Sequence, residues 1–124
     1  MTTTLLVLCL AIAADGTGDD EEQRRKAVAR IAPAKAKQLE IRVGEQAPRA
    51  AALVVKPLLR WSYPTAGSVF GEVFLWTGGG GPAAIASIYR WYHPFKDSTV
   101  EVVSITDQPV TAREGERVYW ESPA

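Results

Sequence analysis

The side chains that could carry out acid–base chemistry are few and scattered. The only histidine, His93, precedes Pro94, and Asp97 follows four residues after the histidine. A histidine general base needs an orienting acid and a substrate within about 3 Å, and this spacing permits such a pair without requiring it. We favour the alternative, an exposed or turn-stabilising His93, because no second polar cluster accompanies it.

Glu72 and Glu101 are carboxylates within apolar, strand-like segments. The strand pairing predicted below places both on one face of a sheet, roughly 13 Å apart at about 3.3 Å per residue. A glycosidase pair requires about 5 to 9.5 Å, so we expect no paired-carboxylate catalysis. Glu72 is expected to be satisfied by Arg60, Arg90 or a hydroxyl, with a ligand contact as the alternative.

Other kinds of catalytic or binding site are incomplete. A closed zinc site uses about four Cys, His or carboxylate ligands, whereas the chain has one Cys and one His. We expect no metal and no cofactor. The glycines at 78–81 are not followed by Lys-Ser/Thr and lead into a strand, which argues against a P-loop. With 14 basic and 14 acidic residues, nucleic-acid binding is not expected.

Aromatic residues form the second candidate for a functional site. All of them lie between Trp61 and Trp120. Such rings can stack against sugars, but core packing is favoured because a small sheet protein needs large side chains to bury enough apolar area. The ligand-binding candidates are Trp61, Tyr63, Trp76, Tyr89, Trp91 and Glu101.

A helix is predicted before the aromatic region. Acidic residues dominate positions 15–22 and basic residues dominate 24–37, an order that complements the dipole of a helix from Asp19 to Ala32. Pro33 should end or kink this helix. Its apolar face is thin, which leaves open whether it is packed or is a solvated arm.

The strongest strand signal is a hairpin. Val69–Trp76 and Ala83–Tyr92 are rich in β-branched and aromatic residues and flank the glycine run. If the four glycines form the loop, paired residue numbers add up to 159, and Phe74 faces Ile85. One face would then carry Phe70, Phe74, Trp76, Ile85, Tyr89 and Trp91. Because both faces are largely apolar, we expect a sheet that is covered on both sides or closed toward a barrel.

Further strands are predicted on both sides of this hairpin. Leu39–Val43 alternates apolar and polar residues, Thr99–Thr106 is strand-like, and Val110–Arg113 pairs with Arg117–Trp120 in a second hairpin. The expected fold is α+β: an N-terminal helix followed by an antiparallel β-meander of about five to six strands. We expect a charged helical arm at 14–38 and a single antiparallel β-rich domain at 39–124.

The N-terminus has the features of an export signal. Leu5–Ala13 is apolar and uncharged, and it is shorter than the roughly 20 residues that span a bilayer. Ala11 and Ala13 have the spacing that signal peptidase accepts, which predicts a signal peptide at 1–13. The segment lacks a preceding Lys or Arg, so a buried N-terminal strand or helix is the alternative. Export would place the protein in the periplasm or outside the cell, without a stable membrane span after cleavage.

Two segments carry a resemblance to a known family. Leu59–Thr77 reads LRWSYPTAGSVFGEVFLWT and Ala86–Tyr92 reads ASIYRWY. They resemble a family of exported hypothetical proteins from planctomycete bacteria, in which the pattern looks like R-W-S-N-P-x-x-G-S-x-Y-G-x-V-F-x-W-T. The resemblance implies export and no particular activity.

The chain departs from that family at two places. It has a glycine run where the family has a charged residue such as Arg, and it retains only Glu101 of a His-Glu-x-His-like strand. Family members continue beyond the position of Trp120, which leaves open whether the domain is truncated at its C-terminus.

These features favour an exported, non-catalytic binding or structural module of the cell envelope, with a glycan or a protein as partner. One alternative is a small-ligand enzyme in which Glu72 and His93 line a cavity. The other is an inactive fragment of a longer protein, which would leave an apolar sheet face open to solvent.

The N-terminus of the exported protein tests the signal-peptide prediction. N-terminal sequencing should find a chain that begins at Ala14 or Asp15, because cleavage is expected after Ala13 or Ala14. A variant combining Ala11→Lys with Ala13→Lys should retain Met1. Recovery of the unmodified chain outside the cytoplasm with Met1 still attached would support the buried-segment alternative instead.

Overall fold

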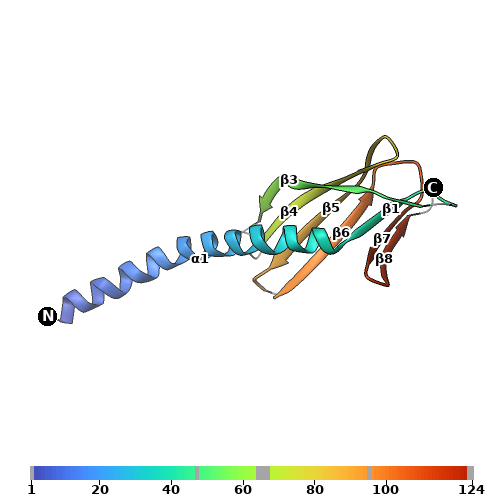
Figure 1. Ribbon diagram of the computed structural model, residues 1–124. Helices are drawn as coiled ribbons and strands as arrows, with labels where there is room; N and C mark the ends of the chain where they lie inside the picture. Colours follow the sequence, from blue (N-terminus) through green and yellow to red (C-terminus); the bar gives the residue numbers. More distant parts are fainter. Residues whose placement is uncertain (1, 47, 64–67, 95, 123–124) are drawn as a thin grey trace.

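The computed structural model describes residues 2–46, 48–63, 68–94 and 96–122, and within these ranges it describes the side chains from Asp20 to Glu121. Its elements are α1 (Thr2–Gln38), β1 (Glu40–Val43), β2 (Arg49–Ala50), β3 (Ala52–Ser62), β4 (Val69–Gly78), β5 (Gly81–Trp91), β6 (Asp97–Ser104), β7 (Val110–Glu114) and β8 (Arg117–Ser122) (Figure 1). Sheet A has the strand order β2-β1-β7-β8, and sheet B has the order β3-β4-β5-β6. The α+β class is therefore confirmed.

The prediction of one meander with five to six strands is wrong, because the described residues form eight strands in two antiparallel sheets. Sheet B alone is a meander. In sheet A, β1 pairs with β7, from the far end of the chain. The chain passes between the sheets at Ala51, whose N–H donates to the carbonyl of Ile41 at 2.7 Å. A pairing between such distant segments leaves no local signal in the sequence.

The hairpin of β4 and β5 turns at Gly79 and Gly80, whose φ angles of 66° and 91° suit glycine. Gly78 pairs with Gly81, as the sum of 159 predicts, but a bulge beyond Trp76 shifts the pairing by one residue. Phe74 therefore pairs with Ala86 instead of Ile85. Because side chains alternate between faces, this shift divides the rings that were predicted to share one face.

One face of sheet B carries Phe70, Phe74 and Trp76, which are buried in a core shared with α1 and sheet A. Ile85, Tyr89 and Trp91 lie on the other face of sheet B, as their pairing with odd-numbered residues of β4 requires. The single aromatic face that the sequence predicted is thus replaced by two faces with different surroundings.

The helix continues through Pro33 to Gln38. The prediction that Pro33 ends the helix is therefore wrong. Proline removes one hydrogen bond from a helix interior. The helix is held on both sides of Pro33 because Val28, Ala32 and Ala36, at four-residue spacing, are buried against the strands. Their small side chains let α1 approach β3, β4 and β5 closely.

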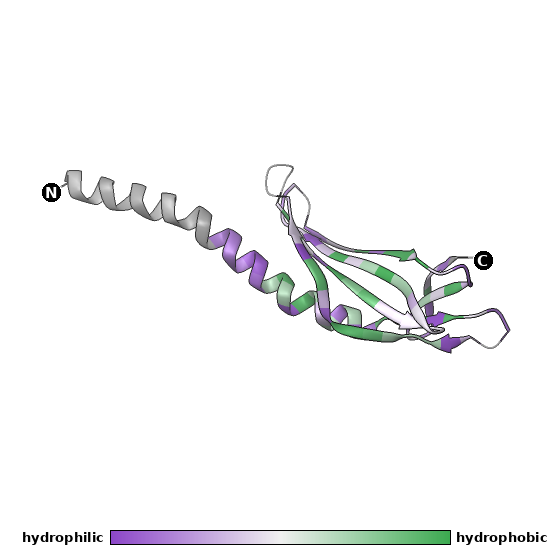
Figure 2. Ribbon diagram, turned by 90° about the horizontal axis from the view of Figure 1, so that it is seen from above, coloured by the Kyte–Doolittle hydropathy of each residue, from purple (hydrophilic) through white to green (hydrophobic). Residues whose placement is uncertain are grey.

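The sequence pattern of α1 follows this docking. Figure 2 shows a hydrophilic stretch of the helix giving way to a more hydrophobic one as α1 reaches the strands. Cleavage of the predicted signal would leave this docked part in place. Among the helical residues with described side chains, no stretch is long and apolar enough to cross a bilayer.

Sheet B is covered on one face only, which corrects the expectation of a sheet covered on both sides or closed toward a barrel. Leu59 and Val103, on the face away from α1, are each 52% exposed. The helix packs against one face. On the second face Val69 and Gly71, near the start of β4, are buried, and the other described side chains are partly or fully exposed. We call this second surface the outer face of sheet B.

Lys35 joins α1 to sheet A. Its ammonium forms an ion pair with Glu114 of β7, and Tyr119 of β8 donates a hydrogen bond to the same carboxylate at 2.9 Å. The hydrogen bond from Lys35 lowers the pKa of Glu114, and Tyr119 lowers it further. The same bond to Glu114 raises the pKa of Lys35.

Glu114→Gln should lower the melting temperature at neutral pH and have no effect in strong acid. Because the folded pKa of Glu114 is lowered, its contribution is present above the ordinary carboxyl pKa of about 4.3 and is lost as the pH falls through the folded value. The raised pKa of Lys35 preserves the pair up to alkaline pH. Thermal unfolding followed by circular dichroism between acid and neutral pH measures the difference.

Glu116→Gln is the control, since Glu116 is exposed in the turn that follows β7. An effect of Glu114→Gln that stays the same from neutral to acid pH would contradict the ion-pair explanation.

Candidate functional site

The outer face of sheet B is the candidate site. Its side chains come from alternate positions of four strands, as the strand register requires. They are Val54, Leu59, Trp61, Val69, Gly71, Val73, Leu75, Ile85, Ser87, Tyr89, Trp91, Asp97, Thr99, Glu101 and Val103.

Trp61 of β3 lies over Gly71 of β4. A Cβ atom at position 71 would lie 2.6 to 2.7 Å from three atoms of the indole, so only glycine leaves room for the ring. The indole N–H reaches across to β5 and donates to Ser87 Oγ at 3.2 Å. The ring therefore lies across three strands with its polar atom already bonded.

Tyr89 and Glu101 continue this surface toward β6. The rings of Tyr89 and Trp61 are tilted by 56° with their centroids 5.3 Å apart, a favourable aromatic geometry. The hydroxyl of Tyr89 donates to Glu101 Oε1 at 2.6 Å. This hydrogen bond raises the pKa of Tyr89, and burial raises it further. The phenol therefore stays protonated and bonded to the carboxylate.

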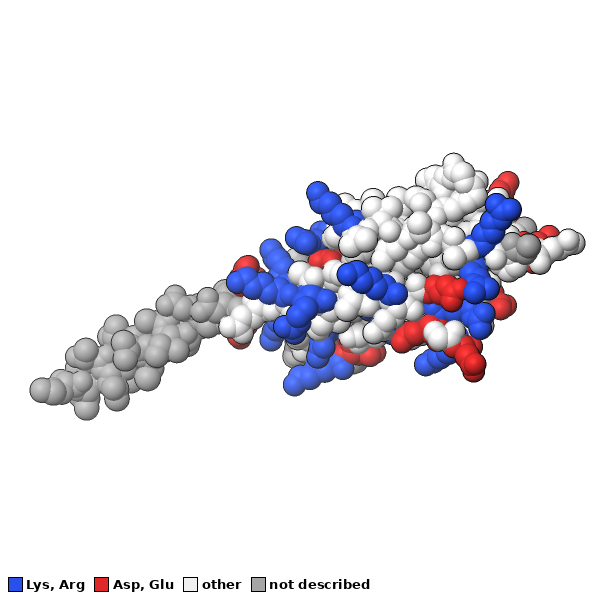
Figure 3. Space-filling model, in the orientation of Figure 1, with Lys and Arg blue, Asp and Glu red and all other residues white. Residues whose placement is uncertain are grey.

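The other half of the outer face is aliphatic. Leu59 pairs with Val73, and Val54 pairs with Leu75, which pairs in turn with Ile85. Leu59 is 52% exposed and Val54 is 38% exposed. Figure 3 shows the molecule from the side of α1, where Lys and Arg gather over the described part of the helix and the visible surface near β3 is largely uncharged.

Five of the six ligand-binding candidates belong to this side of sheet B. Trp61, Tyr89, Trp91 and Glu101 lie on the outer face, and Tyr63 follows β3 beside it, bonded through its N–H to the carbonyl of Val69. The sixth candidate, Trp76, is 1% exposed and packs in the core on the opposite face of sheet B.

The candidates for acid–base chemistry are separated. Glu72 faces α1 and is 1% exposed, whereas His93 is exposed in the loop after β5. Asp97 begins β6, and its carboxylate accepts a hydrogen bond from the N–H of Ser98 at 2.8 Å. Neither His93 nor Asp97 lines the cavity beside Glu72.

The prediction that Glu72 and Glu101 share one face is wrong. In the observed register Glu72 pairs with Ile88, and Glu101 pairs with Ser87, the next residue along β5. Successive residues point to opposite faces, so the sheet itself separates the two carboxylates. Glu72 instead accepts a hydrogen bond from Arg60 Nε at 2.9 Å, and Arg60 was among the partners expected for it.

Several residues of the outer face were not singled out in the sequence. Gly71, Ser87, Leu59 and Val103 belong to it only through the observed register. Because alternate residues of a strand share a face, the position of Leu59 two residues before Trp61 places it on the same face. This alternation cannot be extended to Val54, because the four residues between Val54 and Leu59 interrupt the regular pairing with β4.

Chemically, the outer face offers aromatic and aliphatic carbon with a carboxylate near one edge. Within the described chain, no cluster of three or more His, Cys, Asp or Glu side chains is placed to hold a metal ion. Comparisons with protein families, curated proteins and solved structures give no match. The interpretation of the site therefore depends on its geometry.

Gly71→Ala should destabilise the protein by about 1–3 kcal/mol, because the added methyl group overlaps the indole of Trp61. Urea denaturation measures the loss. Gly81→Ala is the control, since nothing lies within 4 Å of a Cβ at that position. Combining Gly71→Ala with Trp61→Ala should remove most of the Gly71 effect. Additive effects of the two substitutions would contradict the close contact.

Proposed function

We propose that the chain is an exported, non-catalytic module that binds another protein through the outer face of sheet B. The observation that carries the proposal is the contrast between bonded polar atoms and exposed carbon on this face. The N–H of Trp61 and the hydroxyl of Tyr89 are bonded to neighbours within the sheet. Leu59 and Val103 remain about half exposed.

Such a face is complementary to an apolar protein surface. Contiguous apolar patches on a protein surface mark interaction sites, and aromatic residues are enriched at the centres of interfaces. Because the polar atoms of the rings already have partners, a docked protein would not leave them unsatisfied. The rings are also held in place before binding, which reduces the entropy lost on association.

The acidic side chains at one edge of the outer face indicate which charge a partner should carry. On the outer face, acidic side chains lie on β6, where Asp97 begins the strand and Glu101 accepts the hydrogen bond from Tyr89. A complementary partner has an apolar centre and a Lys or Arg positioned opposite this edge. The resemblance to exported proteins and the signal-like segment 1–13 support a location in the periplasm or outside the cell.

The separation of Glu72 from His93 supports a non-catalytic role. The competing enzyme hypothesis needs both side chains in one cavity. His93 is exposed, and the cavity beside Glu72 is lined by residues of α1, β3 and β4.

A glycan is the second candidate partner, and one observation favours it. The indole of Trp61 lies across a glycine instead of standing upright from the sheet, which is a suitable geometry for stacking against a sugar ring. Glu101 could accept hydrogen bonds from sugar hydroxyls.

Leu59→Glu should weaken binding of the protein partner at least tenfold, because it places a charge in the apolar half of the face. A photo-cross-linking residue at position 59, introduced in the native host, identifies the partner. The affinity of the purified pair is then measured by calorimetry. Leu58→Glu is the matched control, since Leu58 is 53% exposed but lies in the irregular segment of β3 that has no paired residue in β4.

Equal losses of affinity for the two variants would contradict the proposal. Binding to a polysaccharide that Trp61→Ala abolishes, without any protein cross-link at position 59, would favour the glycan instead. Cross-links only between copies of this chain would assign the face to self-association.

A further inference from the structure

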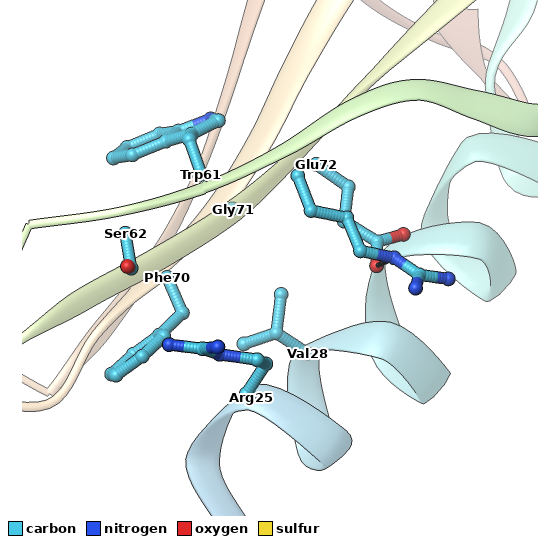
Figure 4. A pocket seen from close by; sticks show the side chains of 8 residues that line it. Arg25, Val28, Trp61, Ser62, Phe70, Gly71 and Glu72 are labelled. Carbon is cyan, nitrogen blue, oxygen red and sulfur yellow. Dashed lines mark hydrogen bonds and ion pairs between the residues drawn. The ribbon is translucent and has the colours of Figure 1, made fainter. Parts of the chain in front are cut away.

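A cavity of about 330 Å³ lies between α1 and the strands β3 and β4, beside the edge of sheet B that β3 forms. Figure 4 shows Arg25 and Val28 approaching it from the helix, and Phe70 and Glu72 from the sheet. Arg60, Trp61 and Ser62 of β3 and Gly71 of β4 also line it. Its contents would be shielded on one side by the helix and on the other by the sheet.

Glu72 is the feature of this cavity that requires an explanation. It is 1% exposed, and its Oε2 accepts the hydrogen bond from Arg60 Nε at 2.9 Å. Its Oε1 is buried and has no hydrogen-bond donor in the described part of the protein. A buried carboxylate oxygen without a donor is unfavourable, because it has lost its hydration without replacement. The cavity therefore contains an acceptor that a ligand could satisfy.

Two guanidinium groups border the same cavity. The side chain of Arg60 remains 63% exposed although its Nε is bonded to Glu72. Arg25 is exposed, and its guanidinium carbon lies 5.8 Å from the centre of the Phe70 ring. Two cations and one carboxylate give the lining a net charge of +1. A ligand with one negative charge complements this total, and guanidinium groups bind carboxylates in a two-point geometry.

The remaining lining is partly apolar. Val28 and Phe70 are 4% and 2% exposed, and they present carbon between the acceptor and the cations. A ligand therefore needs an apolar body in addition to its polar groups.

We propose that this cavity binds a small hydroxycarboxylate with an apolar body. The hydroxyl group donates to Glu72 Oε1, the carboxylate pairs with Arg25 and Arg60, and the carbon skeleton contacts Val28 and Phe70. A hydroxycarboxylate fits better than a zwitterionic amino acid because Arg60 already neutralises Glu72 and the lining retains one positive charge. This site shares Trp61 and Gly71 with the edge of the outer face, but none of the ligand contacts proposed here involves these two residues.

Three probes of similar shape test the proposal by NMR titration of the full chain, with the methyl groups of Val28 and the ring of Phe70 as reporters. Phenyllactate carries both polar groups, hydrocinnamate lacks the hydroxyl, and phenylpropanediol has a neutral alcohol in place of the carboxylate. Phenyllactate should bind about tenfold more tightly than either analogue, the difference expected for one charge-assisted hydrogen bond. Equal affinities, or no saturable shifts of the reporters, would overturn the proposal.

Two variants assign the contacts. Glu72→Gln should abolish the preference for phenyllactate over hydrocinnamate, because the charge-assisted hydrogen bond from the hydroxyl group is lost. Arg25→Met should weaken both carboxylates and leave phenylpropanediol unchanged. Because Arg25 is exposed, the second variant remains informative if Glu72→Gln does not fold. Arg30→Met is the control, since Arg30 is an exposed arginine of the same helix outside this cavity. Equal effects of Arg25→Met and Arg30→Met would overturn the proposal.

Discussion

The organisation of this protein depends on the packing of one helix against a sheet that is apolar on both faces. Val28, Ala32 and Ala36 of α1 share one buried cluster with Phe74 and Trp76 of sheet B. Residues of sheet A complete this cluster: Ile41, Val43, Val110 and Ala112. Burial of aromatic rings provides much of the stability of a small domain. Since the helix covers a single face, the second face keeps its exposed aliphatic and aromatic carbon.

The two faces place polar groups differently, and this difference separates the functions proposed for them. On the outer face, the polar atoms of Trp61 and Tyr89 are bonded to Ser87 and Glu101, so the surface presents mainly carbon. Under the helix, Glu72 has one bonded and one unbonded oxygen beside a cavity. The first arrangement suits an apolar macromolecular surface, and the second suits a small polar ligand.

The sequence predicted those features that depend on neighbouring residues. Gly79 and Gly80 turn the central hairpin, since consecutive positive φ angles strongly favour glycine. The sequence did not predict the bulge after Trp76, which moves every pairing in the rest of the hairpin by one residue. For that reason the expected common face of Glu72 and Glu101 was wrong. The course of α1 beyond Pro33 also depends on tertiary packing, which outweighs the preference of proline to end a helix.

The exposure of the outer face can be measured directly by NMR with a soluble paramagnetic probe. In a monomeric sample, the methyl signals of Leu59 and Val103 should be strongly attenuated, because both side chains are 52% exposed. The signals of Val28 and Ile88, each 4% exposed under the helix, should be retained. Equal protection of all four side chains in a monomer would mean that the outer face is covered, and would contradict its role as a binding surface.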